Sequence, residues 1–378
     1  MVRDGPVSRR GSKTRIGPVR SHKCALATNV MSIVFENVFK PLCSSTMARP
    51  TIHDVAAAAG VSVATVSKAV NGRYGVAEAT VDRVLRAVSD LGYESSLIAS
   101  SMRSRKTGVI GVLVADFEPF SAEILKGVGT AMRGAGHDLL AYSGSLQADG
   151  EGWERRSLSR LSGTLVDGVI MVTPTVVNVA AEVPIVAVDP HTGPADLPTV
   201  EADSFGGAWQ ATSFLIELGH RRIGFIAGRA DLRSSIARDA GYRKALADGG
   251  LMFDPSLVGS GRYRQDAVRE VAREMLSRPD RPTAVFAAND LSAIEIMRVA
   301  AELGIDVPHD LSVVGFDDVP EATQASPALT TVRQPMQRLG ETAAGMLLQL
   351  MRGEQLKATR VRLPTRLVRR GTTAPPAV

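Results

Sequence analysis

Cysteine is scarce in this 378-residue sequence: Cys24 and Cys43 are the only two, and both lie within the first 46 residues. The rest of the chain cannot contain a disulfide framework or a cysteine-ligated zinc site, which favours a reducing compartment, and we expect a cytoplasmic protein. No stretch of 18 or more apolar residues occurs either. We therefore expect no membrane span and no membrane partner.

The motifs of several common enzyme classes are also missing. No G-x-x-x-x-G-K-[ST] phosphate loop and no G-x-S-x-G nucleophile turn with a suitable histidine occurs. Gly127-Val128-Gly129 lies in an expected helix and lacks the full dinucleotide fingerprint. Asp317-Asp318 invites a metal or acid–base interpretation and His220 a metal one, but no second His or Cys stands at metal-ligand spacing from His220. We expect no enzyme activity, no cofactor and no bound metal.

Length and charge divide the chain. A length of 378 residues is too great for one ordinary core and suits two or three domains. Residues 1–46 carry eight Lys or Arg against two Asp or Glu, residues 47–107 carry eight against five, and residues 108–378 carry 28 against 32. Positive charge is thus concentrated at the N-terminal end, which indicates either a polyanionic partner or only a solvated basic tail.

Residues 1–46 show no regular apolar spacing, and we expect a disordered extension there. Their most apolar stretch, Val30–Val38, is interrupted by Asn and Glu and does not form the core of a secretory signal. Met47 directly precedes the first regular pattern and is a candidate translation start.

Three helices are predicted after Met47: Ile52–Ala59, Ser62 to about Val70, and about Ala77–Leu91. Gly60 separates the first two, and two short helices joined by a glycine-containing turn are typical of a helix-turn-helix. The small side chains of Ala56 and Ala59 allow the second helix to approach the first closely. We expect Val55 and Val66 to form a small core with the third helix.

Residues 54–71 (DVAAAAGVSVATVSKAVN) form a long gap-free motif that resembles the headpiece of the lactose/galactose-repressor family. The resemblance implies a DNA-binding domain over residues 47–94; the alternative is an alanine-rich structural hairpin. It implies that Val63, Ala64 and Lys68 face base edges. It also implies phosphate contacts, although Ser62 can alternatively serve only as a helix cap. The implied phosphate-binding residues are Thr51, Ser62, Thr65, Ser67 and Asn71.

Residues 95–108 correspond to the hinge helix and linker of that family. Ala99 matches the hinge, and Met102 occupies the position of the leucine that the family inserts into the minor groove. Ser95-Ser96 replace the usual Pro-Asn, and Ala77 replaces the serine that caps the third headpiece helix. These departures concern hinge geometry rather than DNA binding.

Beyond Gly108, short apolar strands alternate with helices up to about residue 370, which predicts an α/β fold with parallel sheets covered by helices on both faces. The number of units favours two sheets. Four motifs resemble the core of the same family, which is related to periplasmic sugar-binding proteins. The resemblance implies a two-lobed, effector-binding and dimerising core over residues 109–370, and we expect a disordered tail over 371–378. The motifs are Leu218–Gly224, Ala288–Asp290, Leu311–Asp318 and Leu329–Pro335.

Candidate effector-binding residues should lie just past strand ends, where open α/β sheets bind ligands. Asp290 could accept hydroxyl groups, or it could only cap the following helix. Arg238 matches the family's ligand-binding arginine, although a surface ion pair would also explain it. Tyr263 and Phe120 could stack on an apolar ligand face or belong to the core, and Asp189 ends a further strand.

The resemblance therefore implies a transcriptional regulator, by expectation a repressor, that binds a near-palindromic double-stranded DNA operator as a homodimer. A small-molecule effector would control operator affinity; a sugar or sugar derivative suits the residues, as do sugar phosphates and nucleosides. Release and promotion of DNA binding both stay open. The alternative is a sugar-binding protein without regulatory DNA binding. The end of the chain carries no heptad pattern, which favours a dimer over a coiled-coil tetramer.

Overall fold

The structure is a computed structural model that describes residues 50–70, 75–92, 107–144, 153–161, 165–175, 182–191 and 197–377. The chain divides into two compact units between residues 94 and 95, and each unit is described by itself. The predicted contacts of Asn71, Ala99 and Met102, the extension 1–46 and most of the hinge lie outside the described residues.

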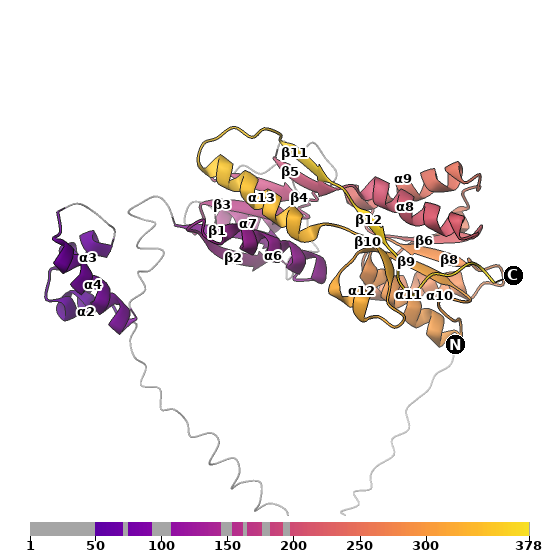
Figure 1. The fold of residues 1–378 in the computed structure, drawn as a ribbon, viewed down its shortest axis with the longest axis horizontal. Coiled ribbons are helices and arrows are strands. Elements are labelled where there is room, and N and C mark those ends of the chain that lie inside the picture. Colours follow the sequence, from indigo (N-terminus) through magenta and orange to yellow (C-terminus); the bar gives the residue numbers. More distant parts are fainter. Residues whose placement is uncertain are drawn as a thin grey trace, which may run out of the picture. The chain divides into compact units, whose positions relative to one another are not determined.

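The described part of the first unit contains three helices, α2 (Ile52–Ala59), α3 (Val63–Val70) and α4 (Glu78–Leu91), shown at the indigo end of the chain in Figure 1. Gly60 ends α2 with φ 63°, a left-handed conformation that glycine adopts without steric cost, so the chain can turn sharply into α3. The predicted helix-turn-helix is confirmed. Its buried core is built from small side chains, which keep the helices close: Val55, Ala56, Ala59, Val66, Ala69, Val84 and Ala87.

The second unit has two lobes, and the amino-terminal lobe is built on a six-stranded sheet of order β11-β5-β4-β3-β1-β2 in which every described pair is parallel. Helices α6 and α13 cover one face of this sheet, and α7 packs on the other. The elements are β1 (Val109–Val114), α6 (Pro119–Met132), β2 (Asp138–Ser143), α7 (Trp153–Leu161), β3 (Gly168–Val172), β4 (Ile185–Val188), β5 (Thr199–Ala202), α13 (Met336–Met351) and β11 (Arg360–Leu363).

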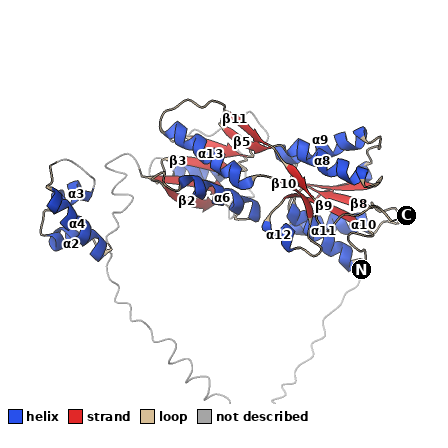
Figure 2. Ribbon diagram, viewed as in Figure 1, coloured by secondary structure: helices blue, strands red, loops and turns tan. Residues whose placement is uncertain are grey.

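The carboxy-terminal lobe has a six-stranded sheet of order β12-β10-β9-β8-β6-β7, parallel except for the pair β10–β12. Helices α8 and α9 cover one face, and α10 and α11 cover the other (Figure 2). The elements are α8 (Ser204–Glu217), β6 (Ile223–Ala227), α9 (Arg233–Asp248), the 3-10 helix Pro255–Leu257, β7 (Val258–Ser260), α10 (Gln265–Leu276), β8 (Ala284–Ala287), α11 (Asp290–Glu302), β9 (Ser312–Asp317), α12 (Pro320–Gln324), β10 (Thr330–Arg333) and β12 (Arg366–Val368).

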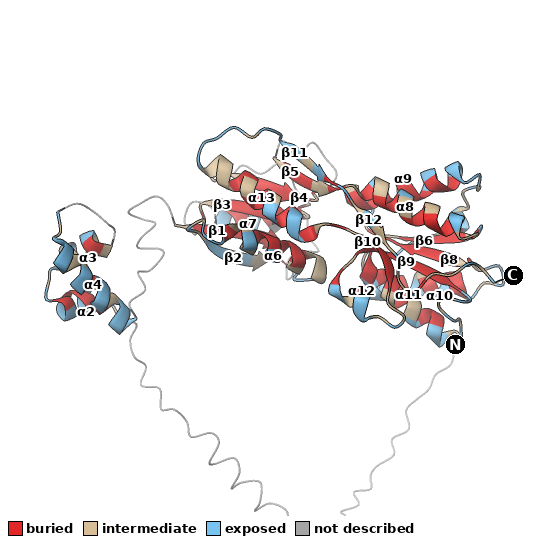
Figure 3. Cartoon of the chain, viewed as in Figure 1, coloured by how far each residue is buried: buried red, intermediate tan, exposed pale blue. Residues whose placement is uncertain are grey.

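The central strands of both sheets are buried on both faces, as Figure 3 shows. All residues of β1, β3, β4, β8 and β9 are buried, which explains why their sequences are mostly apolar and do not alternate between apolar and polar residues. The predicted α/β class with two helix-covered sheets is confirmed. Among the helices of the described residues, none has the length and apolar character needed to cross a bilayer.

Six elements of the described residues were not predicted from the sequence: β5, β10, β12, α7, α12 and the 3-10 helix Pro255–Leu257. Strands β10 and β12 read TTVR and RLV, so they lack the long apolar run that marked the other strands. The chain passes between the lobes at β5–α8, β10–α13 and β11–β12, so each lobe is assembled from separate parts of the sequence.

The prediction of a disordered tail from residue 371 is wrong. Thr372 is fully buried: its carbonyl accepts a hydrogen bond from Val313 N at 2.8 Å, and its Oγ1 accepts one from Thr330 N at 2.9 Å. The carbonyl of Ala374 faces His220 Nε2 at 2.9 Å. The tail therefore satisfies polar groups of β9, β10 and the α8–β6 turn, an order that its proline-rich composition does not reveal.

The two long helices of the amino-terminal lobe cross at a pair of glycines. A Cβ on Gly127 of α6 would lie 1.9 Å from the carbonyl oxygen of Gln337, and a Cβ on Gly340 of α13 would lie 2.2 Å from that of Ile124. Neither approach is possible for a larger residue unless the backbones move. This contact helps to place Phe120, a predicted effector-binding residue, because Phe120 lies in the first turn of α6.

We predict that Gly127→Ala destabilises the core by about 1–3 kcal/mol, because the new methyl group overlaps a backbone carbonyl that cannot relax cheaply. Gly129→Ala is the matched control: it lies in the same helix with nothing within 4 Å of its Cβ position, so it should be neutral or slightly stabilising. Thermal unfolding followed by circular dichroism compares the two. Equal melting temperatures for both variants would contradict the close crossing.

Candidate functional site

The first turn of α3 is held by Ser62. Its Oγ accepts a hydrogen bond from Thr65 N at 3.1 Å and lies 2.9 Å from Thr65 Oγ1. Before α2, the amide and the hydroxyl of Thr51 both donate to Asp54 Oδ2 at 2.7 Å, which lowers the pKa of the Asp54 carboxyl. Both hydroxyl residues therefore have a structural role in capping, and each remains exposed.

The outer face of α3 carries the residues predicted to face DNA. Ala64 and Lys68 are exposed and lie one helical turn apart, so their side chains share a face. Val63, Thr65 and Ser67 flank this face and are partly exposed, and Val63 also packs against the headpiece core. The helix thus exposes a small apolar side chain, which can contact thymine methyl groups, and one cation, which can bind guanine acceptors.

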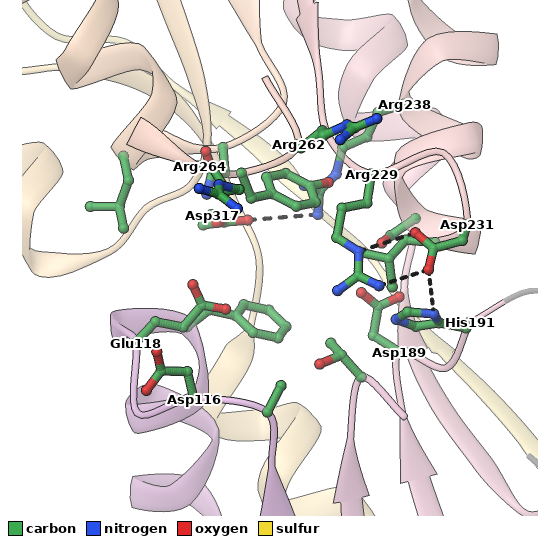
Figure 4. A pocket seen from close by; sticks show the side chains of 18 of the residues that line it. Asp116, Glu118, Asp189, His191, Arg229, Asp231, Arg238, Arg262, Arg264 and Asp317 are labelled. Atoms are coloured by element: carbon green, nitrogen blue, oxygen red, sulfur yellow. Dashed lines mark hydrogen bonds and ion pairs between the residues drawn. The ribbon is translucent and has the colours of Figure 1, made fainter. Parts of the chain in front are cut away.

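A cavity of about 740 Å³ lies between the two lobes of the second unit. Figure 4 shows side chains from both lobes pointing into it. Most of its lining follows the carboxyl ends of strands in both sheets, the place where open α/β sheets bind ligands. Four of the five predicted effector-binding residues line it: Phe120, Asp189, Arg238 and Tyr263.

Strained backbone is concentrated at this cavity. Among the described residues, the non-glycine positions with positive φ are Thr173, Asp189, Arg262, Tyr263, Asp317 and Asp318, and all except Asp318 line the cavity. Such conformations cost about 1–3 kcal/mol each and persist where the surrounding structure imposes them. Their clustering indicates that these strand ends serve a purpose other than stability.

Arg238, on α9, is the buried cation of the cavity, with 3% of its surface exposed. Its Nη1 donates to the Ala288 carbonyl at 2.5 Å and to the Tyr263 hydroxyl at 3.3 Å, and its Nη2 lies 3.6 Å from Asp317 Oδ1. The guanidinium also lies 3.9 Å above the Phe316 ring. Its Nε is buried and has no hydrogen-bond partner among the described residues.

Asp317 was not among the predicted site residues, yet it lines the cavity beside Arg238. It ends β9 with φ 116°, and its Oδ1 accepts a hydrogen bond from Gln334 Nε2 at 2.6 Å. Burial raises the pKa of Asp317 to about 7, an effect that nearby Arg238 opposes. Its position past a strand end was the available signal. Its neighbour Asp318 is structural, since Arg333 and Arg370 both pair with it.

The prediction that Asp290 binds the effector is wrong. Asp290 is fully buried and does not line the cavity, and both of its carboxylate oxygens accept hydrogen bonds from the protein, from Val319 N at 2.9 Å and from the Thr331 hydroxyl. Burial and the neighbouring Asp317 raise its pKa. Asn289, one residue earlier, lines the cavity and caps α11 through Ser292 N at 3.0 Å.

The lobes touch directly along one side of the cavity. His191, which follows β4, forms an isolated antiparallel bridge with Leu232 before α9. Its Nδ1 lies 3.0 Å from Asp231 Oδ2. Asp189 is hydrogen-bonded to Ser234 of α9, and burial raises the pKa of Asp189. All five residues line the cavity, so a ligand there would lie against the contact between the lobes.

Two family models match the sequence. The one described as "Bacterial regulatory proteins, lacI family" matches residues 51–96, and the one described as "Periplasmic binding protein-like domain" matches residues 212–373. The HTH-type transcriptional regulator CelR of Thermobifida fusca is 36% identical over 85% of this chain and 97% of its own. Catabolite control protein A of Priestia megaterium is 32% identical over 85% of this chain and 99% of its own.

Solved structures also match this chain over most of its length. A transcriptional regulator CelR–cellobiose complex is 35% identical, with a TM-score of 0.65, and the match covers 86% of this chain and all of that one. A lac repressor dimer bound to operator and the anti-inducer ONPF is 27% identical with a TM-score of 0.74, covering 86% of this chain and 99% of that one.

We predict that Asp317→Asn stabilises the protein relative to wild type, and increasingly so as the pH rises from about 4 to about 7. The folded state raises the pKa of this carboxyl, so ionising it costs folding free energy once the pH exceeds the pKa of the unfolded chain. The difference should be small near pH 4 and level off above pH 7. Thermal unfolding of both proteins across this range checks it; a pH-independent difference would contradict the buried acid.

Proposed function

Because the chain belongs to the lacI family of bacterial regulatory proteins and is thus a DNA-binding transcriptional regulator, we propose that a sugar bound in the interlobe cavity controls its operator affinity. The observation that carries the proposal is the cavity itself, where strained strand ends and a buried arginine surround a space of about 740 Å³. The protein is a regulator rather than an enzyme, and it acts in the cytoplasm, where its DNA lies.

Operator recognition is assigned to the exposed face of α3. Val63 and Ala64 contact thymine methyl groups, and Lys68 reaches guanine acceptors. Thr51, Ser62, Thr65, Ser67 and Asn71 bind phosphates and fix the register, while Ala99 and Met102 of the hinge enter the minor groove. One headpiece buries too little surface for strong specificity, so a homodimer binds a near-palindromic site.

Effector recognition combines aromatic and polar groups from both lobes. Phe120 lies on the amino-terminal lobe and Tyr263 on the carboxy-terminal one, and such rings can pack on the apolar faces of a sugar. Arg238 supplies donors, whereas Asp189 and Asp317 supply acceptors, a mixture that suits a ligand rich in hydroxyl groups. A cavity of about 740 Å³ leaves room for more than one sugar ring, and the similar CelR structure is described as a cellobiose complex.

The two sites communicate through the relative orientation of the lobes. An effector that contacts both lobes favours the orientation in which those contacts exist, and the headpieces of a dimer are spaced by the cores that carry them. Coupling free energies of about 1–3 kcal/mol are typical of such systems. The proposal covers either sign of the effect, release of the operator or tighter binding to it.

Lys68→Ala is predicted to weaken binding to the specific operator by about 1–3 kcal/mol while changing nonspecific DNA binding much less, since a base-edge contact is lost. Operators are first selected from random duplexes with the full chain and then titrated by fluorescence anisotropy at fixed salt. Lys357→Ala, which removes an exposed lysine of the core, is the control. Equal losses on specific and nonspecific DNA would make Lys68 a phosphate contact, and specific binding after deletion of residues 47–107 would refute the headpiece assignment.

Calorimetric titration with cellobiose, glucose, glucose 6-phosphate and adenosine tests the effector class, with cellobiose expected to bind most tightly. Phe120→Ala should weaken that binding about tenfold, because a stacking surface is removed. Phe117→Ala is the matched control: Phe117 is 54% exposed and does not line the cavity. Tighter binding of adenosine than of any sugar, or equal losses in the two variants, would overturn the assignment.

A further inference from the structure

His191 touches the effector cavity and the opposite lobe at the same time. It follows β4 of the amino-terminal lobe, it is 4% exposed, and it lines the cavity. Its backbone pairs with Leu232 of the carboxy-terminal lobe, and its own N–H donates to the Pro174 carbonyl at 3.0 Å within its lobe. The imidazole is therefore placed by backbone contacts on both sides and not by its side chain alone.

The two ring nitrogens of His191 have different surroundings. Nδ1 lies 3.0 Å from Asp231 Oδ2 across the lobe boundary, and Asp231 is itself held by Arg229, whose Nη2 donates to the same oxygen at 2.7 Å. Nε2 receives no hydrogen bond from any residue that the structure describes. Figure 4 shows His191 and Asp231 at one side of the cavity, joined by a dashed line.

The protonation of this histidine fits an acceptor role for Nε2. Burial lowers the pKa of His191, although Asp231 opposes the shift and Arg229 adds to it. The ring is thus neutral near pH 7, and with Asp231 as the acceptor at Nδ1 the proton stays on Nδ1. Nε2 then carries a lone pair, which can accept a hydroxyl hydrogen but cannot donate.

We propose that His191 couples effector occupancy to lobe closure: its Nδ1–H holds Asp231 of the opposite lobe, and its Nε2 accepts a hydrogen bond from a hydroxyl group of the effector. The inference rests on the proposed function in placing the effector in this cavity. A hydroxyl bound at Nε2 orients the ring toward Asp231 and strengthens the contact between the lobes. An effector without a hydroxyl at that point binds without the same closure.

Asparagine separates the two roles. The side-chain amide of His191→Asn can occupy the position of Nδ1 and still donate to Asp231, but it has no atom where Nε2 was. His191→Ala and Asp231→Ala remove the contact between the lobes altogether. The matched control is His309→Ala, because His309 Nδ1 makes a similar contact with Asp306 Oδ2 at 2.6 Å on the exposed surface of one lobe.

The first measurement follows the lobes without any ligand. Spin labels are placed at Glu341→Cys on α13 and Glu270→Cys on α10, both exposed, in the full chain with Cys24→Ser and Cys43→Ser. Double electron–electron resonance should give one dominant distance for wild type, for His191→Asn and for His309→Ala. It should give a broader distribution for His191→Ala and for Asp231→Ala. The double variant His191→Ala/Asp231→Ala should be broadened to the same extent as the single variants.

The second measurement titrates cellobiose calorimetrically and the operator by anisotropy with and without cellobiose. His191→Asn and His191→Ala should both weaken cellobiose binding by about fivefold or more. The ratio of operator dissociation constants with and without cellobiose should move toward one in His191→Ala and Asp231→Ala by about fivefold or more, and stay unchanged in His309→Ala.

Unchanged distances in His191→Ala and Asp231→Ala would overturn the link between the lobes. Unchanged cellobiose affinity in His191→Asn would overturn the acceptor role of Nε2. If wild type binds neither cellobiose nor another sugar, the acceptor role fails together with the proposed function, whereas the distances still decide whether His191 holds the lobes. A broader distance distribution in His309→Ala as well would show that the substitutions act by general destabilisation, and it would overturn the specific role of His191.

Discussion

The buried guanidinium of Arg238 is the charge on which the effector cavity depends. It lies near the carboxyl ends of strands, and it is shared among Asp317, the Ala288 carbonyl and the Tyr263 hydroxyl, with Phe316 beneath it. A buried cation in such a place is tolerated because these partners surround it. The contacts with Arg238 in turn hold Tyr263 and Asp317 at the cavity wall, although both residues have positive φ. Tyr263 and Asp317 are therefore both strained in the backbone and part of the cavity lining.

Reading DNA and sensing a small molecule make opposite demands on a chain, and the two units meet them differently. The headpiece needs a small, simple core, since its task is to present one short helix, and alanines and valines suffice. The second unit needs large sheets, because only their carboxyl ends bring side chains from many parts of the sequence to one cavity. The helices of its amino-terminal lobe can lie close enough to serve this purpose because glycines occupy their crossing.

Much of this organisation could be predicted from the residues, and the exceptions have physical causes. Continuous apolar runs such as Val109–Val114 identified the central strands, and the motif after Asp54 identified the headpiece. Strand β10 was missed because its two threonines are buried through hydrogen bonds rather than through apolar surface. Asp290 was predicted to bind the effector because it follows a strand, and only the three-dimensional arrangement shows that Val319 and Thr331 occupy its carboxylate. His191 follows a strand too, but its partner Asp231 is 40 positions away and belongs to the other lobe.

Regulation requires a link between the interlobe cavity and the operator, so the most direct test is the operator dissociation constant of the full chain at zero and at saturating sugar, at one salt concentration. We expect the two constants to differ by about fivefold or more, in either direction. Equal constants, measured while calorimetry shows the sugar bound, would contradict the account.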